Sequence, residues 1–390
     1  MIYIFLKLIF AVLLILPRGY LLVYVIDRSK NFSFGYKFFV GWIFGLAAFA
    51  LDVFSSNVFG GFKLYPWLFW FSAIGQIFGL EFVIFLFERK ILLPNFKKII
   101  PFCQTQLQSF KLWPNWEKII LGIIILTAIF WSAIALGQGT TFAGANNSNI
   151  IFRQFSIDQS FYTAKDISHY FTASLAKYPP NDSLIKVWLA TAAGGLAWPV
   201  MVFASLFYYL IFLAIIYFFL APAISRPARL SAVCFLSNLP IFYFYPSFAQ
   251  AEILSSIFLF LTIAGLFYFQ IGIGNSYFYL AGMALAFAVW TENEALLVFF
   301  PLVVLASIIF LRAKRVNYFQ LFIFWVFPVI TVFPWVSFLV LNRLNIFSWY
   351  LKFLNLTDLA NLAIELIPLL AFFLCFIKLN SLLKLKHEKV

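Results

Sequence analysis

Residues 276–311 read SYFYLAGMALAFAVWTENEALLVFFPLVVLASIIFL, which is two apolar stretches with an acidic segment between them. Each stretch is nearly as long as the run of about 18 apolar residues that identifies a membrane-spanning helix. Charged side chains are costly inside a bilayer, so the acidic segment is expected at its surface. The sequence therefore predicts two membrane helices, 276–291 and 295–311, that are separated by residues 291–294, here called the TENE segment.

The rest of the chain repeats this pattern. It is 64% hydrophobic and only 11% charged, whereas soluble domains are about 25% charged. We predict an all-α polytopic membrane protein with about eleven transmembrane helices. The predicted spans are 3–26, 37–59, 65–87, 118–137, 197–222, 230–246, 251–270, 276–291, 295–311, 318–341 and 359–379. This composition excludes a soluble nuclease, polymerase or kinase, and no nucleic-acid partner is expected despite the net charge of +13.

The charged loops give an orientation. If the spans alternate, one face receives all the basic segments, and the positive-inside rule identifies that face as cytoplasmic. These segments are 89–100, Arg226 with Arg229, Arg312 to Arg315, and the tail with Lys384, Lys386 and Lys389. The C-terminus is then cytoplasmic. The opposite, outer face receives the long polar loop 138–184, the segment 246–252 and the TENE segment.

The loop 138–184 is the most polar part of the chain. From about Asp158 to Lys177 its apolar residues follow rough helical spacing, which predicts an amphipathic helix resting on the membrane interface. Tyr178-Pro179-Pro180 ends that helix, because proline lacks an N–H donor and restricts the residue before it. A further amphipathic stretch, SLIKVWLATAAGG (183–195), leads to the next span.

An ordered set of motifs in this region resembles a known family. Ile157-Asp158, Lys165-Asp166 and Tyr178-Pro179-Pro180 are followed by Ala249-Gln250-Ala251-Glu252 and then by Thr291-Glu292-Asn293-Glu294-Ala295-Leu296. The order and spacing are similar to those of the GT-C superfamily of membrane glycosyltransferases, in particular bacterial relatives of the dolichyl-phosphate-mannose protein mannosyltransferases. The resemblance covers roughly residues 118–312. It divides the chain into an N-terminal transmembrane extension with a basic loop (1–117), a GT-C-like core (118–317), and C-terminal helices with a basic tail (318–390).

The resemblance implies a sugar transfer from a polyprenyl-phosphate donor to a glycan, lipid or protein acceptor, at the outer face of a bacterial plasma membrane. Asp158 stands where the family has its catalytic acidic residue. It is expected to act as the general base that takes the proton of the acceptor hydroxyl. The residues expected around the donor phosphate and the sugar are Lys165, His169, Tyr178, Glu252 and Glu294. No cofactor or metal is expected, since the two histidines and three cysteines have no ligand spacing and Asp158 and Asp166 are eight residues apart.

Other readings remain open. Each candidate residue has an ordinary structural role, such as a helix cap for Asp158 or an interfacial lysine for Lys165. Glu292 stands where the family has lysine, and Ala295 where it has glycine, which is compatible with a catalytically inactive scaffold subunit. Asp52 and Glu81 lie inside predicted spans, which favours a transporter or flippase of lipid-linked sugars.

Overall fold

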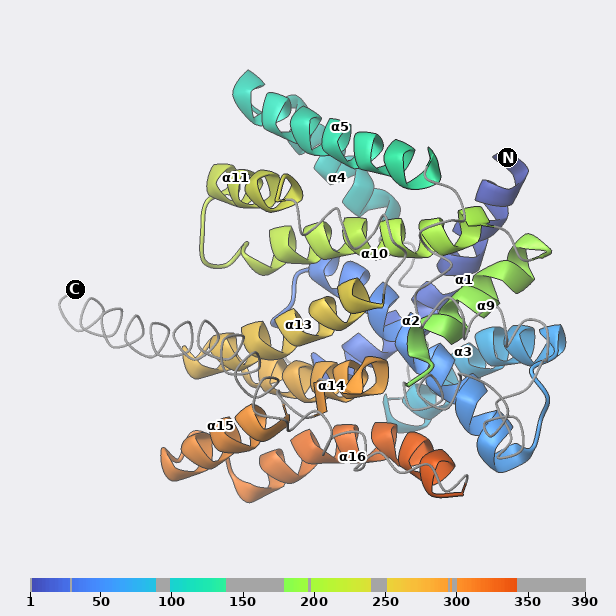
Figure 1. The fold of residues 1–390 in the computed structure, drawn as a ribbon. Coiled ribbons are helices and arrows are strands. Elements are labelled where there is room, and N and C mark those ends of the chain that lie inside the picture. The colour runs from blue at the N-terminus through green and yellow to red at the C-terminus, as the bar shows by residue number, and fades with distance from the viewer. Residues whose placement is uncertain are drawn as a thin grey trace, which may run out of the picture. The chain divides into compact units, whose positions relative to one another are not determined.

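The computed structural model describes residues 2–28, 30–88, 99–137, 179–195, 198–239, 251–293, 295–296 and 300–341. Every regular element in these ranges is a helix, which confirms the all-α fold class (Figure 1). The chain divides into two compact units, residues 1–335 and 336–390, and the contacts described below lie within the first unit.

Seven helices in the described ranges are long and apolar enough to cross a membrane, and all seven overlap predicted spans. They identify the chain as an all-helical integral membrane protein. These helices are α1 (Ile2–Ile26), α2 (Phe34–Gly60), α3 (Pro66–Glu88), α5 (Asn115–Gly137), α10 (Trp198–Phe219), α13 (Glu252–Gln270) and α16 (Tyr318–Leu341).

The count of eleven spans is not confirmed, because three predicted spans coincide with shorter helices and the fourth, 359–379, lies outside the described residues. The shorter helices are α11 (Arg226–Ser237), α14 (Asn275–Thr291) and α15 (Phe300–Arg312). Helix α11 ends where the side-chain amide of Asn238 donates to the carbonyl oxygen of Cys234 at 2.8 Å, two residues before a proline. In addition, residues 99–111, which no predicted span covers, form the 13-residue helix α4 (Ile99–Lys111).

Helix α2 is the centre of the first unit. It packs on α1, α3, α9 (Asn181–Ala193), α10 and α14. Its approach to α1 depends on three glycines, because a Cβ atom on Gly19 would overlap the carbonyl oxygen of Gly41 and lie 2.6 Å from the backbone nitrogen of Gly45. Gly41 and Gly45 are four residues apart, which is the small-residue spacing that lets membrane helices pack closely.

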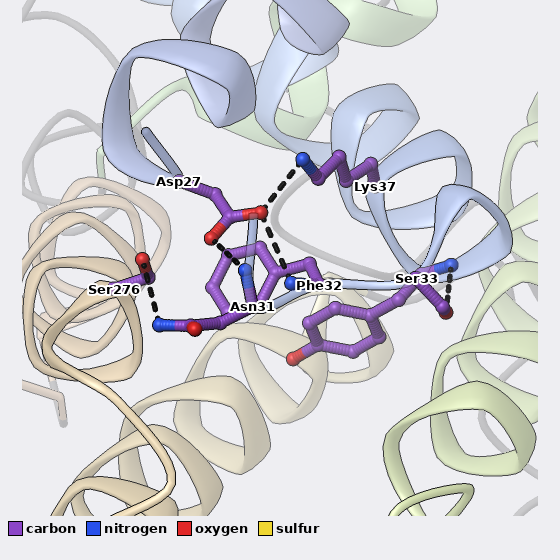
Figure 2. Close-up of polar contacts among 7 residues, drawn as sticks. Asp27, Asn31, Phe32, Ser33, Lys37 and Ser276 are labelled. Atoms are coloured by element: carbon purple, nitrogen blue, oxygen red, sulfur yellow. Dashed lines mark hydrogen bonds and ion pairs between the residues drawn. The ribbon is translucent and has the colours of Figure 1, made fainter. Parts of the chain in front are cut away.

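The connector between α1 and α2 is held by one buried carboxylate (Figure 2). Asp27 accepts hydrogen bonds from the backbone N–H groups of Asn31 at 2.7 Å and Phe32 at 3.0 Å, and it pairs with the ammonium of Lys37 at 2.7 Å. The side-chain amide of Asn31 then donates to the hydroxyl of Ser276 at 3.3 Å. This connector is therefore fixed to the first turn of α14.

Candidate functional site

Five of the six predicted site residues lie outside the residues that the structure describes. They are Asp158, Lys165, His169, Tyr178 and Glu294. The amphipathic helix expected over about 158–177 lies there too, and all of these assignments stay predictions. The sixth residue, Glu252, is described: it is the first residue of α13 and is half-buried.

Most of the TENE segment is described, and it is a helix end rather than a simple exposed loop. Helix α14 stops at Thr291, and Glu292 adopts an extended conformation (φ −148°, ψ 144°). The backbone N–H of Glu292 still donates to the carbonyl oxygen of Ala288 at 3.0 Å, which closes the last turn. Asn293 is only 3% exposed, so the chain turns inward directly after the helix.

Helices α13 and α14 form a tightly packed hairpin, in which four residues join the end of α13 to the start of α14 (Figure 1). In an antiparallel pair, the first residues of one helix lie level with the last residues of the other. Glu252 therefore lies at the same end of the hairpin as Thr291 and Glu292. Two of the motifs that carry the family resemblance are thus brought to one end of the helix pair.

Helix α9 differs most from the sequence analysis, which describes its residues as an amphipathic stretch. All ten residues from Asn181 to Ala190 are buried, because α9 lies among α1, α2, α3, α10 and α14. Trp188 is fully buried, and its indole N–H donates to the carbonyl oxygen of Ala11 in α1 at 3.4 Å. At the C-terminus of α9, the ammonium of Lys7 donates to the carbonyl oxygen of Ala193 at 3.4 Å. A cation is favourable there because the helix dipole is negative at its C-terminus.

A buried hydrogen bond joins α9 to the TENE segment. The side-chain amide of Asn181 donates to the hydroxyl of Thr291 at 2.8 Å, across 110 residues of sequence. The same hydroxyl donates to the carbonyl oxygen of Phe287 at 2.6 Å. Asn181 directly follows Tyr178-Pro179-Pro180, and Pro179 and Pro180 are buried. A third motif of the family resemblance therefore ends beside the TENE segment.

One turn of α9 also carries a buried ion pair. The carboxylate of Asp182 pairs with the ammonium of Lys186 at 2.5 Å and accepts a hydrogen bond from the hydroxyl of Tyr208 in α10 at 3.1 Å. Asp182 is 2% exposed, and Lys186 and Tyr208 are fully buried. We call the set Asn181, Asp182, Lys186, Tyr208 and Thr291 the α9–α14 junction.

The sequence analysis did not identify the junction as a site. The available signal was the four-residue spacing of Asp182 and Lys186, which places an acid and a base on one face of a helix. Nothing in the sequence indicated Tyr208 as their partner. The junction adds no net charge, because its carboxylate and ammonium compensate each other. Buried ion pairs are weak evidence for stability, and ionisable groups inside membrane proteins commonly mark functional sites.

Within the described residues, no group of three or more histidine, cysteine, aspartate or glutamate side chains is placed to hold a metal ion. The junction therefore offers hydrogen-bonding and charged groups, with only one carboxylate that could serve as a metal ligand.

Searches against protein-family models, curated proteins and solved structures find no match to this chain. The fold defines the class as an all-helical integral membrane protein. Its described part contains a buried polar junction between α9 and the end of α14.

Proposed function

We propose that the chain is a membrane glycosyltransferase, which moves a sugar from a polyprenyl-phosphate donor to a glycan, lipid or protein acceptor at the outer membrane face. One observation carries the proposal: the 2.8 Å hydrogen bond between Asn181 and Thr291. It joins the end of the Tyr178-Pro179-Pro180 motif to the start of the TENE segment. Motifs that form one site must meet in the fold, and these two are 110 residues apart in sequence.

The α13–α14 hairpin adds a second line of support. Glu252 and the TENE segment are at the same end of this hairpin, so three of the motifs converge on one end of the helices. In this proposal the loop 138–178 contributes Asp158, Lys165 and His169 to the same end.

The proposed chemistry is a substitution at the anomeric carbon of the donor sugar. The acceptor hydroxyl oxygen forms a bond to that carbon, and the bond from the carbon to the phosphate oxygen breaks. Asp158 takes the proton of the acceptor hydroxyl, and polyprenyl phosphate leaves with its negative charge. Lys165 and His169 stabilise the leaving phosphate, and Glu252, Glu294 and Tyr178 contact the sugar at the rim of the site.

The test is sugar transfer in membranes that contain the chain, supplied with radiolabelled polyprenyl-phosphate sugars. We expect transfer by wild type, and loss of at least a hundredfold for Asp158→Asn at equal protein level, since a positioned base contributes about 10²- to 10⁴-fold. Asp166→Asn is the matched control, because it makes the same change eight residues further along the same loop. It should retain most of the activity.

The result of this assay distinguishes the enzyme hypothesis from the scaffold hypothesis. Transfer that is equal in wild type and Asp158→Asn would remove Asp158 as the base. Absence of transfer from every donor tested, with folded protein, would overturn the enzyme and favour a scaffold subunit.

A transporter or flippase of lipid-linked sugars is the second candidate. Two buried ion pairs favour it: Arg18 with Asp52, between two candidate membrane spans, and Asp182 with Lys186 in α9. Purified chain in vesicles with a fluorescent polyprenyl-phosphate sugar distinguishes the two candidates. A flippase brings label from the inner leaflet to an impermeant quencher outside without an acceptor, whereas a transferase releases polyprenyl phosphate only when an acceptor is present.

A further inference from the structure

Arg18 lies inside an apolar helix and is only partly satisfied. It is in the candidate span Tyr3–Ile26 and is 6% exposed. Its Nη2 atom pairs with the carboxylate of Asp52 in α2. Its Nε and Nη1 atoms are buried and have no hydrogen-bond partner among the described residues. Because guanidinium is always charged and carries five N–H donors, this arrangement leaves most of its hydrogen-bonding capacity unused.

The packing of α1 against α2 explains the geometry of this pair. Gly19, the next residue after Arg18, lies against Gly41 and Gly45. Asp52 is seven residues beyond Gly45, which corresponds to about 10 Å along the helix axis. The Arg18 side chain must therefore extend along α2 to reach Asp52. It meets the carboxylate with one nitrogen instead of the two-nitrogen fork that arginine favours with carboxylates.

The two partners also differ in accessibility. The side chain of Asp52 is 28% exposed, whereas that of Arg18 is 7% exposed. Asp52 is thus the member of the pair that can move away, and its departure would uncover the guanidinium. A ligand that replaces Asp52 must be anionic and must offer several oxygens to fill the unused donors. A phosphate group has both properties and matches the planar guanidinium.

We propose that Arg18 and Asp52 form a phosphate site in which the phosphate of a membrane-embedded polyprenyl carrier competes with Asp52 for Arg18. This inference rests on the proposed function for the identity of the lipid, and it assigns that lipid a binding residue in the N-terminal helices. Asp52 acts as a counter-ion that keeps Arg18 neutralised when the site is empty. The competition predicts opposite effects when each residue is replaced.

The test measures binding of polyprenyl phosphate to the purified full chain in detergent micelles by native mass spectrometry. Arg18→Gln should weaken binding at least tenfold, because it removes the charge that the phosphate contacts. Asp52→Asn should strengthen binding severalfold, because it removes the competing carboxylate. Glu81→Gln is the matched control, since Glu81 is another buried acid of the N-terminal helices, in α3, and it should change binding less than twofold.

Two further probes identify the source of the phosphate. Uncharged polyprenol should bind more weakly than polyprenyl phosphate, and that difference should disappear in Arg18→Gln. Inorganic phosphate should bind more weakly than the lipid. Equal affinity for inorganic and lipid phosphate would overturn the lipid assignment, and equal affinity for polyprenol and polyprenyl phosphate in wild type would overturn the phosphate site.

Folding is controlled by the double variant Arg18→Gln with Asp52→Asn, which leaves no unpaired charge. We expect it to be as stable as wild type and to lose the preference for phosphate. If Asp52→Asn weakens binding as much as Arg18→Gln does, in protein of wild-type stability, the pair has only a structural role. Lipid-phosphate binding without any sugar transfer would keep this site and remove the proposed function, whereas undiminished transfer by Arg18→Gln would do the reverse.

Discussion

The ion pair of the α9–α14 junction allows a quantitative test of how α9 is held. Asp182→Ala leaves the ammonium of Lys186 buried without the carboxylate that lies 2.5 Å away in wild type. Removing one partner of a buried ion pair costs about 3–5 kcal/mol. At 1.4 kcal/mol per factor of ten, the folding equilibrium should fall by a factor of roughly 100 to 5,000. Tyr208→Phe removes one hydrogen bond to a charged group and should cost about 1.5–3 kcal/mol.

The measurement is equilibrium unfolding in mixed detergent micelles, followed by tryptophan fluorescence. The chain has twelve tryptophans, so the signal follows unfolding of the chain as a whole, and Trp188, buried two residues after Lys186, contributes to it. The matched control is the double variant Asp182→Leu with Lys186→Met, which removes both charges and keeps similar volumes. Replacing a buried ion pair by apolar residues is often neutral or stabilising, so most of the loss should be recovered.

Two results would refute this reasoning. One is an Asp182→Ala variant whose free energy of unfolding lies within about 1 kcal/mol of wild type, which would mean that water or another acid compensates Lys186. The other is a double variant that is no more stable than Asp182→Ala. In that case the cost would arise from the shape of the site and not from the unpaired charge.

Three further predictions use the same unfolding measurement. Gly19→Leu should cost about 3 kcal/mol or more, because the new side chain overlaps the backbone of α2, whereas Gly122→Ala, with open space around its Cβ position, should be nearly silent. Asp27→Ala should cost about 3–5 kcal/mol, since it removes the acceptor of two backbone N–H groups and the partner of a lysine. Thr291→Val keeps the side-chain shape but leaves the buried amide of Asn181 without its acceptor, and should cost about 1–3 kcal/mol. A cost below about 0.5 kcal/mol for Gly19→Leu, Asp27→Ala or Thr291→Val would contradict the contact concerned.

Hydropathy alone located most of the long helices, because a bilayer imposes both length and composition on a spanning segment. The prediction 318–341 agrees with α16 at both ends, and 251–270 differs from α13 by one residue. The first turn of α2 was missed, although Ser33 caps it by accepting the N–H of Tyr36 at 3.3 Å. Hydropathy does not register a serine cap, whereas capping preferences do.

The candidate site was predictable only in part. The acidic interruption of the apolar run correctly predicted that the TENE segment marks a helix boundary, and α14 ends at Thr291. The burial of α9 was not predictable from hydropathy, because a 13-residue helix with two charges resembles an interfacial segment. The ion pair of Arg18 with Asp52 was also missed. It depends on the stagger between α1 and α2, which the glycine contacts determine and which a hydropathy profile does not contain.

Three contacts between helix ends constrain how the chain crosses the membrane. If each contact joins groups at one membrane face, an even number of crossings must separate the two residues. Between Glu117 and Arg226, which form a 2.6 Å ion pair, the chain crosses twice, through α5 and α10, provided that α9 does not cross. This number is even. From Thr291 back to Asn181 the chain contains α10 and α13, and counting the shorter helix α14 as a crossing makes the number odd.

The bond between Asn31 and Ser276 gives the same result, because α2, α3, α5, α10 and α13 also make an odd number. One more crossing between α10 and α13 would make both numbers even. This parity favours the sequence prediction of a span over 230–246, of which the structure describes the part up to residue 239. Single cysteines in a cysteine-free background test it with an impermeant maleimide. Ala228→Cys and Ile273→Cys should label from one side of the membrane and Ser247→Cys from the other, whereas labelling of all three from one side would exclude the crossing.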